Sequence, residues 1–381
     1  MERLRRTISK QVGVAALAAA VAVLGIAGAF GGAGTASANS RDGAVYTLSN
    51  QAAGNAVLIF DREADGSLTA AGSVATGGLG TGGGLGSQGA VILTDDNRTL
   101  IAVNAGSNEL SVFEVRKGGI TLVDRVPSGG TRPISVTAHD QVVYALNAGG
   151  TGNIAGFHLG EDRKLTPIAG SNQPLTTTAA GPAQIAFTPE GEQLIVTEKA
   201  ANAIATYEVD DGVASGPVSH ASSGATPFGF DFARGHGLIV SEAFGGAPGA
   251  SAVSSYHVSD DGDVNPITAS AATHQTAACW IVVTGNGRFA YTTNTGSGSI
   301  SGYGIAADGS LTLLNADGRT ADTGAGSAPT DMALSNNSRF LFALGSGSHQ
   351  ISGFRVSGDG SLTPAGALGG LPVGAVGLAA R

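Results

Sequence analysis

The sequence predicts an all-β fold, a seven-bladed β-propeller with four antiparallel strands in each blade. One aromatic residue recurs seven times, at gaps of 53, 44, 50, 49, 47 and 51 residues. Each interval contains short β-rich runs separated by turn clusters, which is the pattern of strands and hairpins. The residues after position 38 number 343, which equals seven units of 49. The recurring aromatic residues are Phe60, Phe113, Phe157, Tyr207, Tyr256, Tyr303 and Phe354.

The second unit shows the expected order of strands. An apolar run at 90–93 predicts the innermost strand, and the run at 100–103 predicts its neighbour beyond an Asp/Asn turn. The third and fourth strands are expected at 110–115 and 120–123. The inner strands of later units are expected to begin near Ile134, Gln184, Phe230, Trp280 and Met332.

Recurring Asp-Gly pairs mark equivalent hairpins and predict type I′ turns, in which both residues have positive φ. These pairs stand at 65–66, 261–262, 308–309 and 359–360.

The two ends of the repeat array are complementary. The first unit begins at 45–48 with a run that matches the second strand of the others, so its inner strand is missing. The last residues, 375–380, resemble an inner strand with no blade after it. We therefore expect the C-terminal strand to complete the first blade, which closes the ring and removes free sheet edges.

Residues 1–38 are predicted to be an export signal, and residues 39–381 a single propeller domain. A basic start is followed by an apolar stretch at 12–30 and a small-x-small site, Ala36-Ser37-Ala38. The pair Arg5-Arg6 also resembles a twin-arginine signal. The mature protein is therefore expected to be exported, to an extracellular, periplasmic or cell-envelope location; an uncleaved anchor is the alternative.

The charge balance excludes several classes of partner. The net charge is −9, and removal of four basic residues and Glu2 with the signal leaves −12. An acidic chain with scattered Lys and Arg argues against nucleic acid and against an anionic membrane surface.

Cys279 is the single cysteine, so no intrachain disulfide can form. We expect a monomer that binds a small molecule, a lactone or a sugar-like compound.

Two classes of loop are expected at the mouth of the central channel, one before each inner strand and one after each second strand. Polar groups that converge on one funnel are the usual binding-site hypothesis, although Asn side chains also cap turns. The predicted substrate-binding residues are Gln88, Arg132, Gln184, His274, Asp331, Asn104, Asn147 and Asn294.

Glu198 and Glu242 replace Asn at the ends of second strands in adjacent blades, and we predict that they are catalytic. Two facing carboxylates would repel, and one would hold its proton more tightly and act as a base on water. An ion-paired structural role, with Arg132 as a partner, is the alternative. No cofactor is expected; a hard divalent cation held by Glu198, Glu242 and Asp331 is a weaker hypothesis.

Other catalytic patterns receive no support. Gly78-x-Gly80-x-x-Gly83 lies in a glycine-rich stretch with no following helix and no Gly-Lys-Ser/Thr, so a nucleotide site is not expected. A flexible rim over the channel is the preferred interpretation of residues 77–89. No Gly-x-Ser-x-Gly elbow occurs, which argues against a serine hydrolase.

The repeat as a whole resembles the lactonase family of seven-bladed propellers, which includes bacterial 6-phosphogluconolactonase and the 3-carboxymuconate cycloisomerases. The resemblance rests on units such as 287–294, leading to 300–303 and 308–311. The family's Gly-Pro-Arg-His signature keeps Gly181-Pro182 here, but Ala183-Gln184 replaces Arg-His. Glu198 matches the family's glutamate, and Thr295 stands where a further arginine is expected.

The resemblance implies a lactone-ring hydrolase or cycloisomerase, with Glu198 and Glu242 activating water and with Arg132, Gln184 and Gln88 binding substrate. Loss of the cationic pair favours a neutral lactone over a phosphorylated or polycarboxylate substrate. The alternative is a non-catalytic exported propeller that binds a small ligand or a protein partner.

Overall fold

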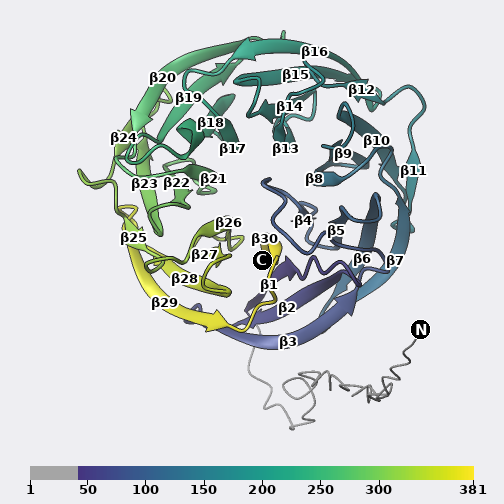
Figure 1. The fold of residues 1–381 in the computed structure, drawn as a ribbon, viewed down its shortest axis with the longest axis horizontal. Coiled ribbons are helices and arrows are strands. Elements are labelled where there is room, and N and C mark those ends of the chain that lie inside the picture. The colour runs from purple at the N-terminus through teal and green to yellow at the C-terminus, as the bar shows by residue number, and fades with distance from the viewer. Residues whose placement is uncertain (1–41) are drawn as a thin grey trace, which may run out of the picture. The chain divides into compact units, whose positions relative to one another are not determined.

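The structure is a computed structural model that describes residues 42–381, so the predicted export signal lies outside the described residues. Seven antiparallel sheets stand around a central axis, which Figure 1 shows end on. The only helix in the described part is a short 3-10 turn, Phe244–Gly246, and no helix there is long and apolar enough to cross a membrane. The predicted all-β, seven-bladed propeller is confirmed.

Blade 1 joins the start of the described chain to its end. Its strand order is β3-β2-β1-β30, with β30 (Val376–Ala380) innermost and antiparallel to β1 (Gly43–Leu48). The other two strands are β2 (Ala56–Arg62) and β3 (Leu68–Ala75). The predicted closure by the C-terminal strand is therefore confirmed, and Figure 1 shows β30 in yellow beside the purple β1.

Blades 2 to 4 follow in chain order, each with its inner strand first. Blade 2 contains β4 (Val91–Leu93), β5 (Thr99–Asn104), β6 (Glu109–Arg116) and β7 (Gly119–Pro127). Blade 3 contains β8 (Pro133–His139), β9 (Val142–Asn147), β10 (Asn153–Leu159), β11 (Leu165–Pro167) and β12 (Gln173–Pro174), of which β11 and β12 both pair with β10. Blade 4 contains β13 (Pro182–Phe187), β14 (Gln193–Glu198), β15 (Ala203–Asp210) and β16 (Val213–Ala221).

Blades 5 to 7 repeat this order. Blade 5 contains β17 (Pro227–Ala233), β18 (Gly237–Glu242), β19 (Ala252–Val258) and β20 (Val264–Ala272). Blade 6 contains β21 (Ala278–Val283), β22 (Phe289–Asn294), β23 (Ser299–Ile305), β24 (Leu311–Leu313) and β25 (Ala321–Asp322). Blade 7 contains β26 (Pro329–Leu334), β27 (Phe340–Gly345), β28 (Gln350–Val356) and β29 (Leu362–Gly369).

The seven recurring aromatic residues all lie on the third strand of their blade, counted from the axis, and are buried. Burial of a Phe or Tyr side chain contributes about 1.5–3 kcal/mol of hydrophobic stabilisation. The phenols also find partners, because Tyr207 donates to the Pro174 carbonyl at 2.9 Å and Tyr303 to the Ala271 carbonyl at 2.8 Å. The aromatic residues therefore recur in the sequence because each blade buries one of them at the same position in its sheet.

The Asp-Gly hairpins are tight turns, but the predicted type I′ geometry is wrong. In the hairpin at 65–66, Gly66 has a φ of +94°, whereas Asp65 is not among the residues with positive φ. The Asp65 carboxylate accepts the Ser67 N–H at 2.9 Å, and this Asx-type bond holds the aspartate in ordinary backbone geometry. The hairpins at 308–309 and 359–360 repeat the same bond.

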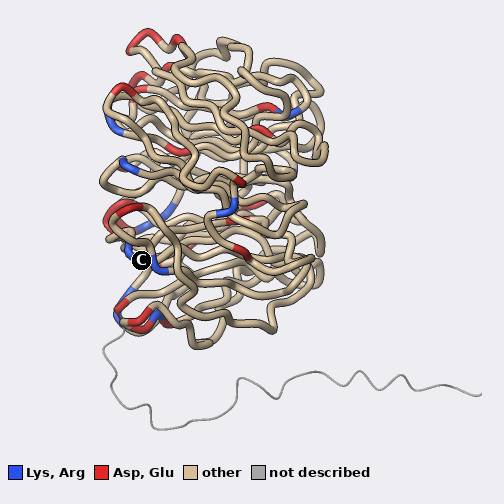
Figure 2. The backbone as a smooth tube through the Cα atoms, turned by 90° about the vertical axis from the view of Figure 1, so that its left-hand side faces the viewer, with Lys and Arg blue, Asp and Glu red and all other residues tan. Residues whose placement is uncertain are grey.

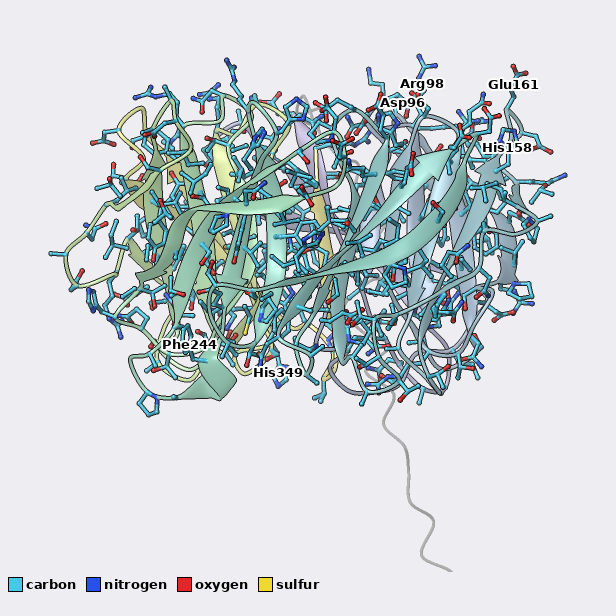
Figure 3. The ribbon with its side chains drawn as sticks, turned by 90° about the horizontal axis from the view of Figure 1, so that it is seen from above. Asp96, Arg98, His158, Glu161, Phe244 and His349 are labelled. Carbon is cyan, nitrogen blue, oxygen red and sulfur yellow. The ribbon has the colours of Figure 1, made fainter. Side chains whose placement is uncertain are left out.

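The two faces of the ring differ in charge. Each inner strand starts where each second strand ends, on the face we call the mouth face; the opposite face is the far face. In Figure 3, Phe244 and His349 mark the mouth face, and Asp96, Arg98, His158 and Glu161 mark the far face. Figure 2 shows that charged residues gather along the far face, where the C-terminus ends.

Candidate functional site

The predicted asparagines at the ends of second strands are fully buried. Asn104 accepts a hydrogen bond from Asn55 at 3.1 Å and donates to Ser111 at 2.7 Å. Asn147 accepts from the Ser128 hydroxyl at 2.7 Å. Asn294 donates to the hydroxyls of Ser299 and Ser301 at 3.1 and 2.9 Å. These buried amides bond to neighbouring strands and loops, so they do not lie open to a ligand in a funnel.

Glu198 and Glu242 occupy the same position and are also fully buried. The Glu198 carboxylate accepts the Thr176 N–H at 3.0 Å and the Thr176 hydroxyl. Burial raises the pKa of Glu198, and the bonds from Thr176 oppose that shift. Since Glu242 contributes nothing to this pKa shift, the predicted repulsion between the two carboxylates is not seen.

Glu242 is held by an even denser set of donors. It accepts the Gly224 N–H at 2.7 Å, the Ser254 hydroxyl at 2.5 Å and the Ser270 hydroxyl at 2.7 Å. An added Cβ at Gly224 would lie 2.1 Å from one carboxylate oxygen, so glycine is required for this approach. Both glutamates therefore fix the segment that enters their own blade, and each of their carboxylate oxygens already accepts at least one hydrogen bond.

Three more predicted residues lie on or beside the inner strands, and their side chains bridge blades. The Gln184 amide accepts the Phe230 N–H at 2.8 Å and donates to the Phe230 carbonyl at 2.9 Å in the next blade. The Gln88 amide makes the same pair of bonds with Ile281 across the channel, at 3.0 and 2.7 Å. Gly229 leaves room for this side chain, because an added Cβ there would lie 2.2 Å from the amide oxygen, Oε1, of Gln88.

Asp331 is the third of these bridging side chains and sits where the ring closes. Its carboxylate accepts the Met332 N–H at 2.8 Å and faces the N–H groups of Gly377 and Leu378 on the closing strand. Burial nevertheless raises the pKa of Asp331 well above its usual value. The side chain is buried against β30, and one of its carboxylate oxygens accepts no hydrogen bond among residues 42–381.

Two cavities lie at opposite ends of the channel. The mouth pocket, of about 410 Å³, is lined by residues of blades 3 and 4 and by Leu85. The far chamber, of about 440 Å³, is lined by inner strands and by the hairpin residues Asp95 and Asn336. Leu85 faces the first cavity and Gln88 the second, so the segment 85–89 lies between them.

Three hydrogen bonds from other parts of the ring hold the segment 85–89 in place. The Ser87 hydroxyl donates to the Ile134 carbonyl at 2.7 Å, and the Trp280 indole N–H donates to the Ser87 carbonyl at 2.8 Å. The Lys199 ammonium donates to the Gly86 carbonyl at 2.5 Å. The flexible rim expected for residues 77–89 is therefore wrong at its C-terminal end, where these bonds close the channel.

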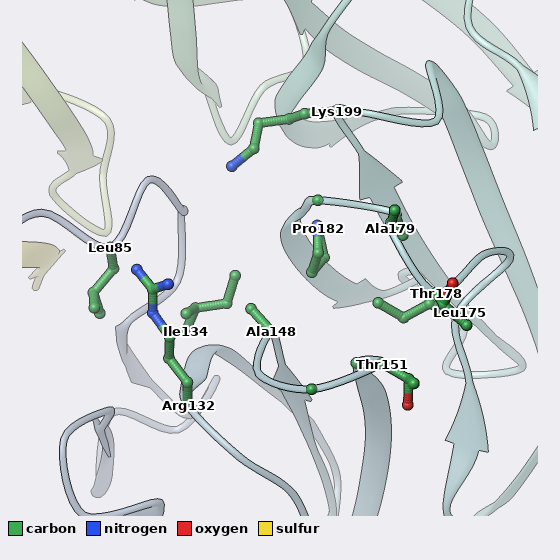
Figure 4. A pocket seen from close by; sticks show the side chains of 14 residues that line it. Leu85, Arg132, Ile134, Ala148, Thr151, Leu175, Thr178, Ala179, Pro182 and Lys199 are labelled. Atoms are coloured by element: carbon green, nitrogen blue, oxygen red, sulfur yellow. The ribbon is translucent and has the colours of Figure 1, made fainter.

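The mouth pocket contains two cationic side chains, Arg132 and Lys199, which extend toward the same opening in Figure 4. The Arg132 guanidinium is exposed and makes no hydrogen bond or ion pair within residues 42–381. Its backbone has a φ of +56° and is fixed by a 2.7 Å bond from its N–H to the Asn108 side chain. No Asp or Glu lines this pocket, so the two charges lack a counter-ion there.

Lys199 is half-buried, and its ammonium lies 4.5 Å from the centre of the Phe228 ring. Burial lowers the pKa of Lys199 to about 8, and the Arg132 charge acts in the same direction. Cys279 lies near this ammonium, and burial raises the pKa of its thiol to about 11. Lys199 is thus a lysine that titrates close to physiological pH.

The repeat itself shows how unusual these two residues are. The residue before the inner strand has positive φ in five blades, and the residue after the second strand bonds to it through its N–H, as Ala148 does to Arg132 and Lys199 to Gly181. The first position is occupied by Arg132, Gly181, Thr226, Ala277 and Ala328. The second is occupied by Ala148, Lys199, Ala243, Thr295 and Ser346. Only blades 3 and 4 place a charge there, and both charges line one pocket.

The structure therefore divides the predicted site. Of the residues proposed from the sequence, only Arg132 lines the mouth pocket, while Gln88, Gln184 and Asp331 line the far chamber. His274 is exposed on a mouth loop and lines neither cavity. Lys199 was missed, although an alignment of the blades against one another would have revealed it as a lone charge.

No metal centre is evident in residues 42–381. No group of three or more His, Cys, Asp or Glu side chains gathers there, so Glu198, Glu242 and Asp331 do not form the cation site considered above. The chemistry available at the mouth is that of two cations beside small, uncharged residues.

The chain was compared with known proteins. The sequence model described as "Lactonase, 7-bladed beta-propeller" matches residues 45–173 and 250–373. The chain belongs to this family. The unmatched stretch, 174–249, contains Glu198, Lys199 and Glu242, whereas Arg132 lies in a matched stretch. No curated protein matches the chain.

Solved structures agree with the fold. A Bacteroides fragilis protein, provisionally described as a 6-phosphogluconolactonase, is 17% identical over 91% of this chain and 99% of its own, with a TM-score of 0.68. A periplasmic gluconolactonase of Pseudomonas aeruginosa is 16% identical over 87% of this chain and 98% of its own, also with a TM-score of 0.68. At such identities the likeness shows the fold alone. Family membership supports a lactonase-type hydrolase.

Proposed function

We propose that this lactonase hydrolyses a neutral, sugar-like lactone in the mouth pocket, and that Lys199 and Arg132 stabilise the charge that develops there. The observation that carries the proposal is a cavity of about 410 Å³ whose lining, among residues 42–381, contains two cations and no Asp or Glu. The family assignment supplies the reaction class.

The charge changes along the reaction fit this site. A lactone is neutral, whereas its tetrahedral intermediate carries an oxyanion and its product carries a carboxylate. Cations held in a partly desolvated pocket therefore bind the transition state more tightly than the substrate, which is the condition for acceleration. Phe228 and the segment 85–89 keep the Lys199 ammonium in place before substrate arrives.

Glu198 receives a different role in this proposal from the one the sequence indicated. Its carboxylate is buried and bonded to Thr176, and the neighbouring Leu175 and Thr178 line the mouth pocket. We infer that Glu198 positions this wall of the pocket. Equal lactone hydrolysis by the wild type and by Glu198→Gln would remove even that role.

The experiment is a panel of γ- and δ-lactones, with ring opening followed by acid release. Lys199→Met should lower kcat/KM by roughly 10²–10³-fold, as loss of one oxyanion donor does in other hydrolases. Lys117→Met is the matched control, because Lys117 is exposed in a far-face hairpin, and it should leave the rate unchanged. Hydrolysis by Lys199→Met at the wild-type rate would overturn the proposal.

A non-catalytic binding role for the same pocket is the second candidate. It is favoured by the carboxylates of Glu198 and Glu242, which are hydrogen-bonded elsewhere, and by the described lining of the mouth pocket, which offers no carboxylate to act as a base on water. Thermal stabilisation by lactones without turnover would support it; turnover lost in Lys199→Met would exclude it. In either case we propose that the protein acts outside the cytoplasm, as its N-terminal sequence suggests.

A further inference from the structure

We propose that Lys199 is a carbonyl-reactive amine that forms a Schiff base with small aldehydes entering the mouth pocket. This goes beyond the proposed hydrolysis, because imine formation uses the neutral amine and oxyanion stabilisation uses the ammonium. Each activity can therefore fail without the other.

Two features of the pocket disfavour a charge on Lys199. The side chain is half-buried, and it shares the cavity with the Arg132 guanidinium, while the described lining contains no Asp or Glu. The Phe228 ring, whose centre lies 4.5 Å from Nζ, and the Gly86 carbonyl act in the opposite direction, because both attract the ammonium. The lysines at 117 and 164 are instead exposed, and Lys164 pairs with Asp162 at 3.4 Å. Desolvation and a neighbouring cation are the two means by which proteins make lysine nucleophilic.

Both means are present here. The charged or titratable groups that act on Lys199 are the Arg132 guanidinium and the Cys279 thiol. The thiol competes poorly as a nucleophile, because its pKa of about 11 keeps it protonated and it is buried. The pKa of Lys199, about 8, leaves a useful fraction of free amine at neutral pH.

The pocket gives a small carbonyl compound access to this amine. Lys199 is one of the residues that line the cavity of about 410 Å³, and Figure 4 shows its amine extending into it. Thr151 and Thr178 also line this pocket, together with small residues such as Gly150 and Gly152. A short hydroxyaldehyde suits this mixture of small and hydroxyl-bearing residues.

The reaction balances without a further reagent. The Lys199 amine adds to the aldehyde carbon, giving a carbinolamine in which the nitrogen proton has passed to the oxygen. Loss of water then forms the carbon–nitrogen double bond. The imine is reversible, so it is trapped experimentally with cyanoborohydride, which delivers hydride to the imine carbon and leaves a stable secondary amine.

The test treats the folded protein with glycolaldehyde and cyanoborohydride, and maps modified lysines by peptide mass spectrometry. At pH 7.5, Lys199 should be labelled at least about 10-fold faster than Lys117 or Lys164, since burial beside a second cation leaves more of its amine unprotonated. The rate at Lys199 should rise with pH through a midpoint of about 8.

Two controls keep the result decisive. In urea-unfolded protein, the three lysines should be labelled at similar rates, because the pocket no longer exists. In Arg132→Met, the midpoint for Lys199 should move to higher pH, since the Arg132 charge helps to lower the pKa. Labelling of Lys199 no faster than Lys117 and Lys164 in the folded protein would overturn the proposal.

Discussion

The mouth pocket and the wall of the channel both carry polar residues on the same repeated framework, yet those residues do different things. Along the wall, the side-chain amides of Gln184 and Gln88 each accept one hydrogen bond from the backbone of another blade and donate one to it. In the mouth pocket, the Arg132 guanidinium has no hydrogen-bond or ion-pair partner among residues 42–381, and the Lys199 ammonium has only the Gly86 carbonyl and the Phe228 ring there. Polar groups that already have partners hold the ring together, whereas charges without a counter-ion are available to a ligand. Changes in the mouth should therefore alter activity, and changes in the wall should alter stability.

The largest expected effect is the pH dependence of the mouth. If the Lys199 ammonium stabilises the oxyanion, kcat/KM should fall about 10-fold for each pH unit above the Lys199 pKa of about 8. Lys199→Arg should abolish this fall up to pH 10, because guanidinium stays charged. A rate that rises through pH 8 would instead make Lys199 a general base and contradict the oxyanion role. Initial rates on one lactone between pH 6 and 10, corrected for spontaneous opening, are the measurement.

In the channel wall, Gln184→Leu should destabilise the protein by roughly 2–4 kcal/mol, because it leaves the N–H and C=O of Phe230 buried without partners. Urea unfolding would measure the loss. Hydrolysis per folded molecule should change little, since Gln184 does not line the mouth pocket. An unchanged stability together with lost activity would return Gln184 to the substrate-binding role predicted from the sequence.

Gly229→Ala should destabilise the ring by about 1–3 kcal/mol, because the added methyl group would lie 2.2 Å from the side-chain amide oxygen of Gln88 and 2.7 Å from the Cys279 carbonyl oxygen. A second change, Gln88→Ala, should cost less in this background than in the wild type, since part of the clash is with the amide oxygen that makes the bridge. Additive losses in a double-mutant cycle would show that Gln88 does not occupy the space beside Gly229.

The smallest effect is expected where the ring closes. The raised pKa of Asp331 means that the folded state prefers the protonated acid, so this group favours folding below its unfolded pKa and loses that contribution as pH rises through its folded pKa. Asp331→Asn should therefore raise Tm by about 1–2 °C at pH 7 and have less effect at pH 4. A larger gain at pH 4 than at pH 7 would contradict this sign.

The sequence predicted the ring well because each repeat of the sequence contains one buried aromatic residue that packs in the core of one blade. The seven buried aromatic residues and the missing first strand define the blades and the closure by β30. The candidate site was predicted less well. Gln184 and Asp331 each lie two residues after the start of their inner strand. At that position the side chain contacts another blade, whereas a residue before the strand would face the mouth.

The sequence pattern predicts a role for Glu198, which matches the family, and none for the adjacent Lys199. Neighbouring residues at a strand end point in different directions, so Glu198 turns to Thr176 and Lys199 to the pocket. A single pair of adjacent residues in a sequence does not indicate which side chain is buried. A comparison of equivalent positions among the blades would single out Lys199, because Ala, Thr and Ser fill the same position in other blades.

The most direct test of the account is a crystal structure of the protein soaked with the hydroxy-carboxylate product of its best lactone. The account predicts the product in the mouth pocket, with its carboxylate within hydrogen-bond distance of both Arg132 and Lys199. Product bound in the far chamber, or in the mouth with its carboxylate turned away from both cations, would contradict it.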